Sequence, residues 1–349
     1  MKTLNLNIWM TCCLISVALL RWEPIQANPR VFIFTDINID KGDPDDRQSL
    51  IHLFWYANEL QIEGIVPDRW EAEGYQACSL VIDAYRRDYR SYKFGKKGYP
   101  SAQRLKKSIA RDSSHASKLF TKAVSDSTQP LYILVWGNLK LCSKLLNQYD
   151  GPIKHIRLIT IATGLMMEKD IPHMPKAWPK TIPCEQLNWN GFGRPEIYNN
   201  PRFDSLWWLE MNWTYSGMFT GEEPKEMFDK LIPYGSLGQH MQEVVKTKAW
   251  AQYFRVGDTP SVLYVIDDNH NINDPTTSSW AGKFMRPFPI KRPHYFTDFF
   301  GDIPWDYHAP CSHWNKHEEA QKAAMQTLEN RREDMYQALL QKLDTLYGN

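Results

Sequence analysis

The chain has 349 residues, of which 43% are hydrophobic and 23% are charged, and its formal net charge is +1. This composition excludes a disordered polymer and a collagen-like fibre. Because 41 basic residues are balanced by 40 acidic ones, no net field favours binding to nucleic acid or to an anionic membrane. The 14 Trp, 17 Tyr and 15 Phe favour a large core and a site lined with rings that stack on a flat or sugar-like ligand.

The amino terminus has the pattern of a secretory signal peptide over residues 1–27. Lys2 is followed by a mostly apolar run over residues 8–20, and the small residue Ala27 ends the segment. Such a run has signal-peptide length and is short for a membrane span of about 20 apolar residues. We therefore expect cleavage after Ala27 and a secreted or periplasmic protein that has no membrane association after cleavage. An uncleaved anchor is the alternative.

Residues 28–349 are expected to form a single domain with a helical extension from about residue 315, because the sequence shows no internal repeat and no low-complexity linker. The cysteines of this part are Cys78, Cys142, Cys184 and Cys311. Their wide spacing does not match a zinc or redox pair. Up to two disulfides and buried free thiols both remain open.

Short β-rich runs alternate with helical apolar stripes through the first half of the chain. The expected strands are 30–35, 61–66, 131–136 and 156–162. The expected helices are 46–57, 77–85, 102–110, 116–124 and 139–146. This alternation predicts an α/β fold with one open, mostly parallel sheet and helices on both faces. In such sheets, ligands bind beyond the carboxyl ends of the strands.

The second half of the chain is less regular. The expected elements are a strand over 205–212, a helix over 236–251, a buried helix or strand over 260–266, and one or two amphipathic helices over 317–346. Residues 167–200, rich in Pro, Lys, Trp and Asn, indicate a long ordered excursion over the sheet. Residues 284–310 are dense in Pro and aromatic residues, which predicts a loop.

Five carboxylates lie between the first expected strand and the first expected helix. They are Asp36, Asp40, Asp43, Asp45 and Asp46. So much like charge in one turn costs free energy unless a cation neutralises it, and carboxylate oxygens suit Ca²⁺ or Mg²⁺. The alternative is an acidic loop in which one aspartate caps the next helix.

Two other acidic motifs fit this turn badly. An EF-hand loop needs Gly and Glu where Lys41 and Arg47 stand. A phosphotransferase of the Asp-x-Asp type needs an aspartate where Asn38 stands.

Five motifs in chain order carry a resemblance to a known family. They are Asp43-Pro44-Asp45-Asp46-Arg47-Gln48-Ser49-Leu50, Gly98-Tyr99-Pro100-Ser101, Val135-Trp136-Gly137, Leu206-Trp207-Trp208-Leu209-Glu210 and Gly257-Asp258-Thr259-Pro260-Ser261. Together they resemble the nucleoside hydrolase superfamily, in particular the secreted nucleoside hydrolase-like domain of cellulose-binding proteins. The resemblance covers about residues 30–290, and we expect no carbohydrate-binding sandwich in residues 291–349.

The resemblance implies a role for each matching residue. Asp36, Asp46, Asp258 and the backbone carbonyl of Lys140 would be Ca²⁺ ligands. Asp45 would be the base that deprotonates a calcium-bound water. The substrate would be a small glycoside or nucleoside-like molecule, cleaved through a transition state that resembles an oxocarbenium ion. A homo-oligomer is compatible with this assignment.

Glu210 and Asn212 match the family's E-x-N pair, which would hold sugar hydroxyls. The alternative is that the two side chains point to solvent from one face of a strand. Asn212-Trp213-Thr214 also reads as a glycosylation sequon, which would place Asn212 outside.

Two departures from the family pattern bear on function. Asp36 and Asp45 are nine positions apart, against four in typical nucleoside hydrolases, so Asp40 or Asp43 could replace Asp36 at the metal. Gly257 stands where purine-accepting relatives have a His that helps to protonate the leaving base. The sequence therefore supports two hypotheses: a calcium-dependent glycosyl hydrolase, and a sugar-binding protein that keeps the metal pocket without turnover.

Overall fold

The strands form one sheet in the part of the chain that the structure, a computed structural model, describes: residues 28–39, 44–68, 71–164, 188–246, 252–303 and 317–348. The strands are β1 (Arg30–Thr35), β2 (Gln61–Pro67), β3 (Leu131–Val135), β4 (Ile156–Ile161), β5 (Trp207–Met211), β6 (Phe284–Met285) and β7 (Tyr295–Asp298). Within these residues the sheet has seven strands in the order β2-β1-β3-β4-β5-β7-β6, and every neighbouring pair is parallel except β6 with β7.

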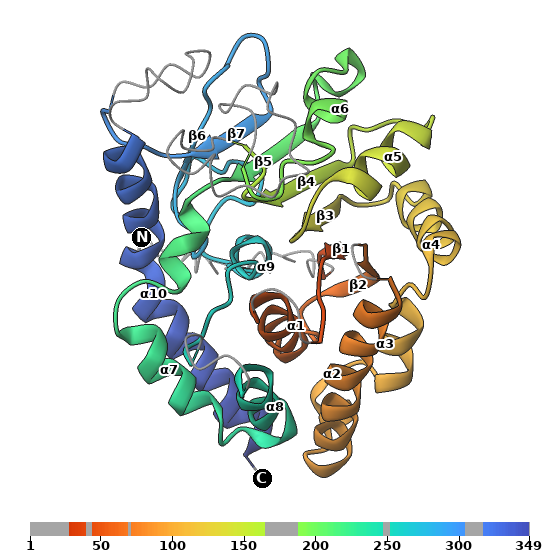
Figure 1. Ribbon diagram of the computed structural model, residues 1–349, viewed down its shortest axis with the longest axis vertical. Coiled ribbons are helices and arrows are strands. Elements are labelled where there is room, and N and C mark those ends of the chain that lie inside the picture. The colour runs from red at the N-terminus through yellow and green to blue at the C-terminus, as the bar shows by residue number, and fades with distance from the viewer. Residues whose placement is uncertain are drawn as a thin grey trace, which may run out of the picture.

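Helices cover both faces of this sheet (Figure 1). The α-helices are α1 (Asp45–Trp55), α2 (Glu71–Ser91), α3 (Ala102–Ser108), α4 (Ser113–Ser125), α5 (Lys140–Gln148), α6 (Arg194–Tyr198), α7 (Glu223–Leu231), α8 (Gly235–Val245), α9 (Pro260–Ile266) and α10 (His317–Tyr347). The 3-10 helices are η1 (Phe94–Lys97), η4 (Pro201–Phe203) and η5 (Thr214–Met218). The predicted α/β class is therefore confirmed.

The buried central strands explain the two hydrophobic layers. Val31 and Ile33 of β1 pack with α1, α2, α8 and α9 on one face, whereas Phe32 and Phe34 pack with α4, α5 and α6 on the other. Side chains of a strand alternate between the two faces, and a parallel sheet that is covered on both faces has hydrophobic residues at nearly every position. The run from Arg30 to Thr35 is buried along its whole length for this reason.

The structure corrects the expectation for residues 284–310. This stretch is not all loop, because β6 and β7 lie within it and β7 adds to the sheet beside β5. Four residues, Tyr295-Phe296-Thr297-Asp298, are too few to show a clear strand period among the surrounding prolines and aromatics. Residues 260–266 form the helix α9, and the carboxy-terminal segment forms one continuous helix, α10.

Several other expectations concern residues that the structure does not describe. Residues 1–27, Asp40, Asp43, Cys184, Cys311 and most of 167–200 lie outside the described residues. Cys78 and Cys142 are buried free thiols. Among the described helices, none has the length and apolar character needed to cross a membrane.

Candidate active site

The acidic turn joins the carboxyl end of β1 to the amino terminus of α1. Asp36 follows β1 directly, and Asp45 and Asp46 are the first two residues of α1. The hydroxyl of Thr35, the last residue of β1, donates to Oδ1 of Asp46 and accepts from the backbone N–H of Ile37 at 3.1 Å. The strand end thereby fixes both the start of the turn at Ile37 and the orientation of the Asp46 carboxylate.

Three carboxylates from distant parts of the chain meet at this edge of the sheet. Oxygen atoms of Asp45, Asp46 and Asp258 all lie within 4.8 Å of one another. Asp258 stands two residues before α9, in a turn that the fold brings against the amino terminus of α1. Asp46 and Asp258 are buried, whereas Asp45 is partly exposed.

The electrostatics of this cluster fit a bound cation. Burial raises the pKa of Asp46 well above its ordinary value, and the nearby carboxylates of Asp258 and Asp36 raise it further. Carboxylate oxygens are the ligands that calcium and magnesium prefer, and a divalent ion would offset both the burial and the mutual repulsion. The carboxylates of Asp45, Asp46 and Asp258, with Asp36 near Asp46, therefore suit a hard divalent cation.

The turn after β3 contributes the close packing around Asp36. A Cβ atom at Gly137 would lie 2.9 Å from Cβ of Asp36, so a glycine is needed for this approach. Lys140 follows as the first residue of α5, and its carbonyl accepts from the hydroxyl of Ser143 at 3.1 Å.

Gly257 gives the Asp45 carboxylate the space that it occupies. A Cβ atom at this position would lie 2.8 Å from Oδ2 of Asp45, 3.4 Å from the Phe219 ring and 3.5 Å from the Tyr215 ring. The carboxylate of Asp45 and the two aromatic rings therefore surround position 257. The absence of a side chain at this position is therefore required for the packing of the site.

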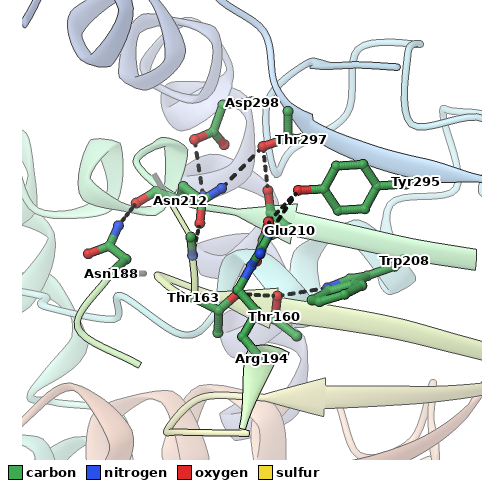
Figure 2. A network of polar contacts seen from close by, with 11 residues as sticks. Thr160, Thr163, Asn188, Arg194, Trp208, Glu210, Asn212, Tyr295, Thr297 and Asp298 are labelled. Atoms are coloured by element: carbon green, nitrogen blue, oxygen red, sulfur yellow. Dashed lines mark hydrogen bonds and ion pairs between the residues drawn. The ribbon is translucent and has the colours of Figure 1, made fainter. Parts of the chain in front are cut away.

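Glu210 lies in a second, separate polar network, shown in Figure 2. It is fully buried in β5, and Arg194 binds both of its oxygens, Nε to Oε1 at 2.6 Å and Nη2 to Oε2 at 2.8 Å. The hydroxyl of Thr163 donates to Oε1 at 2.6 Å, and the hydroxyl of Tyr295 donates to Oε2. Burial raises the pKa of Glu210, but Arg194 and these hydrogen bonds outweigh it, and the pKa is lowered.

Asn212 lies two residues along in the same network. Its Oδ1 accepts from the backbone N–H of Gly164 at 2.7 Å, and its Nδ2 donates to the hydroxyl of Thr297 at 3.2 Å (Figure 2). The Asp298 carboxylate accepts from the backbone N–H of Asn212 at 3.0 Å. Asn212 is 0% exposed, so the alternative in which it faces solvent as part of a glycosylation sequon is wrong.

A left-handed residue shapes this end of β4. Ala162 has φ of 54°, which an alanine adopts at a cost of order 1–3 kcal/mol. Its N–H donates to the carbonyl of Met211 at 2.7 Å, and its carbonyl accepts from the N–H of Asn190 at 2.8 Å. The turn directs Thr163 and Gly164 towards Glu210 and Asn212, so the network contains a strained backbone that its hydrogen bonds hold in place.

The main residues that sequence reasoning missed are the partners of Glu210. Arg194 opens the short helix α6, and Tyr295 opens β7 in the stretch expected to be a loop. Pro195 marks the start of a helix, but no local signal identifies the carboxylate that Arg194 binds. The pairing of Arg194 with Glu210 depends on how the strands are ordered in the sheet, so it cannot be predicted from either segment alone.

The parallel sheet and the acidic edge define a nucleoside hydrolase-like α/β fold. Residues 30–284 match the family model described as cellulose-binding Sde182, nucleoside hydrolase-like domain. The chain therefore belongs to this family.

Two solved structures extend the comparison. A nucleoside hydrolase-related hypothetical protein from Saccharophagus degradans, associated with carbohydrate metabolism, aligns with a TM-score of 0.58 and 17% identity over 92% of this chain and 72% of its own. At this identity, the likeness concerns the fold alone. The inosine-uridine preferring nucleoside hydrolase of Bacillus anthracis aligns with a TM-score of 0.47 and 15% identity, over 90% of this chain and 99% of its own. A search among curated proteins finds no match.

Proposed function

We propose that the protein is an exported, calcium-dependent hydrolase of N-glycosyl or related glycosidic bonds in a small glycoside or nucleoside-like substrate. The observation that carries this proposal is the meeting of the Asp45, Asp46 and Asp258 carboxylates within 4.8 Å. Export rests on the sequence pattern of residues 1–27 alone. A homo-oligomer is compatible with the proposal.

The proposed roles follow from the different surroundings of the aspartates. Asp36, Asp46 and Asp258, with the carbonyl of Lys140, would hold calcium. When bound, calcium would lower the pKa of a coordinated water molecule. Asp46 is buried and would be held by calcium, whereas Asp45 is partly exposed, so a water molecule can reach its carboxylate and transfer a proton to it.

Glu210 and Asn212 remain our candidates for contacts with sugar hydroxyls, with one condition. The two oxygens of a carboxylate together accept about four hydrogen bonds, and Arg194, Thr163 and Tyr295 already supply four to Glu210. A sugar hydroxyl would therefore have to replace one neutral donor, Thr163 or Tyr295. The charged pair with Arg194 would stay in place.

The sharpest test of the enzymatic role compares two neighbouring substitutions. Asp45→Asn should retain stabilisation by calcium but lose hydrolysis by about two to four orders of magnitude, the usual scale for a general base. Asp46→Asn should lose both. The assay would use p-nitrophenyl ribosides with calcium, because their leaving group needs no protonation and the assay then does not depend on a general acid. Equal turnover by Asp45→Asn and wild type would refute the proposed base.

The second candidate function is sugar binding without turnover. One observation favours it: Gly257, the residue immediately before Asp258 in the chain, has no side chain that could protonate a leaving group. The matched family is also described as cellulose-binding. If wild type hydrolyses neither the ribosides nor a broad glycoside panel, yet binds a sugar by calorimetry, this function replaces the first.

A further inference from the structure

The carboxy-terminal helix α10 lies outside the stretch matched by the family model, which ends at residue 284. It runs along one side of the molecule beside α7 (Figure 1) and packs closely against η5. A Cβ atom at Gly217 of η5 would lie 2.8 Å from the carbonyl oxygen of Met325 and 3.3 Å from Leu328. The backbone of η5 is therefore in direct contact with α10.

One buried side chain of α10, Arg332, binds the segment that runs from η5 to the start of α7. Nη1 of Arg332 donates to the carbonyl oxygen of Gly217 at 2.6 Å and to that of Thr220 at 2.7 Å. Its Nη2 pairs with Glu223 Oε2 at 2.8 Å. Arg332 is 6% exposed, and its bond to Gly217 is buried, whereas its bonds to Thr220 and Glu223 are partly buried. Its planar donors fix the backbone geometry.

The opposite side of the same segment borders the acidic cluster. Tyr215 lies within η5 and Phe219 follows it, and their ring centroids are 6.0 Å apart. Both rings lie within 3.5 Å of the Cβ position at Gly257, where the Asp45 carboxylate also lies. A single short segment therefore has Arg332 on one side and the Asp45 carboxylate on the other.

We propose that Arg332 is a positioning residue that holds the rings of Tyr215 and Phe219 against the Asp45 side of the active site. The helix beyond the family match would then complete the wall of the site. The consequence for substrate rests on the function proposed above, whereas the consequence for the rings does not. Because the rings would supply contact area for a flat or sugar-like ligand, their displacement should weaken substrate binding by up to about tenfold.

The test compares three variants of the full chain: Arg332→Ala, Arg332→Lys and Arg331→Ala. Arg331 is the matched control, because it is the neighbouring arginine, is one-third exposed and pairs with Asp334 on its own helix. Arg332→Lys keeps the charge but has no planar fork to bond both carbonyls and Glu223 together. It serves as the folded variant if Arg332→Ala does not fold.

The first measurement is a crystal structure of each folded Arg332 variant. We expect the Tyr215 ring to move away from Gly257, while Asp45, Asp46 and Asp258 keep their positions. Rings that remain within van der Waals distance of Gly257 would overturn the proposal. This result needs no activity, so it stands apart from the proposed function.

The second measurement is the division between KM and kcat on p-nitrophenyl ribosides, or the sugar Kd if turnover is absent. Arg332→Ala should raise KM or Kd by about tenfold with kcat nearly unchanged, Arg332→Lys should lie between it and wild type, and Arg331→Ala should match wild type. A lower melting temperature with unchanged KM or Kd means that Arg332 is only structural. A wild type that neither cleaves nor binds any glycoside defeats the proposed function, and the crystal structures then decide the positioning role alone.

Discussion

Buried carboxylates lie at two places along the carboxyl edge of the sheet, and the charges that surround them differ in sign. In the cluster at β1, Asp46 has other carboxylates, Asp36 and Asp258, among its nearest charges, and its pKa is raised. In the network at β5, Glu210 has the guanidinium of Arg194 as its nearest charge, and its pKa is lowered although it too is fully buried. Burial alone therefore does not decide the state of a carboxylate.

The comparison indicates which of the two places needs an outside ligand. Glu210 is neutralised by a side chain of the same fold, so its network is complete when the chain folds. The cluster at β1 concentrates negative charge, and a bound cation would lower its free energy. Substitutions in the two places should therefore have opposite effects on the stability of the metal-free protein.

The largest effect is expected from breaking the ion pair at β5. Arg194→Ala should lower the free energy of unfolding by about 3–5 kcal/mol, because it leaves the Glu210 charge buried without its cation. Glu210→Gln in the same background should recover part of this loss, since an amide carries no charge. Urea unfolding measures both, with Lys225→Ala as control, because its pair with Glu222 is exposed and worth at most about 1 kcal/mol. A loss below that of the control would contradict the comparison.

A smaller effect of opposite sign is expected at β1. In the presence of chelator, Asp46→Asn should be at least as stable as wild type, because it removes one of the repelling buried charges. Calcium at a hundredfold excess over its Kd should stabilise wild type by about 2.7 kcal/mol and leave the variant unchanged. Thermal unfolding with calcium and with chelator tests this, and Asp229→Asn, an exposed acid, is the control. A wild-type melting temperature indifferent to calcium would remove the metal from the proposal.

The smallest expected effect is a pH dependence of stability that comes from Asp298, a second buried carboxylate in the network at β5. Burial raises the pKa of Asp298 to about 7, despite hydrogen bonds from Thr214, Trp213 and Asn212 that lower it. Because the folded protein holds this proton more tightly than the unfolded chain, the stabilisation is complete below the ordinary pKa near 4 and is lost as pH rises through about 7. Between about pH 5 and 6.5 the loss from this group should be about 2 kcal/mol.

Chemical unfolding across this range, in the presence of chelator, measures the Asp298 effect. Asp298→Asn should flatten the pH dependence, whereas Asp302→Asn, which changes an exposed acid, should leave it as in wild type. An identical slope in wild type and in Asp298→Asn would show that Asp298 does not hold this proton.

The local sequence was sufficient to predict the elements whose hydrophobic period and charge are visible within one segment. The apolar run of β1, the acidic turn and the apolar stripe of α1 are contiguous, so period and charge were sufficient to predict a strand, a group of carboxylates and a helix in that order. The parallel α/β class followed from repeating this pattern. The short strand β7 was missed because its pairing with β5, and not its own period, makes it a strand.

Only the tertiary structure decided which distant residues meet. Asp258 reaches Asp45 and Asp46 across more than 200 positions, Tyr295 reaches Glu210 across 85, and Arg332 reaches Gly217 across 115. The E-x-N pair was recognisable in the sequence, but Arg194, the partner of Glu210, was not, because Arg194 lies in a different element, α6, and no local pattern pairs the two residues. Such contacts depend on the order β2-β1-β3-β4-β5-β7-β6, in which neighbours in space are often distant in the chain. The hydrophobic period of a segment predicts which of its faces is buried. It does not predict which charged residue from another segment will lie against that face.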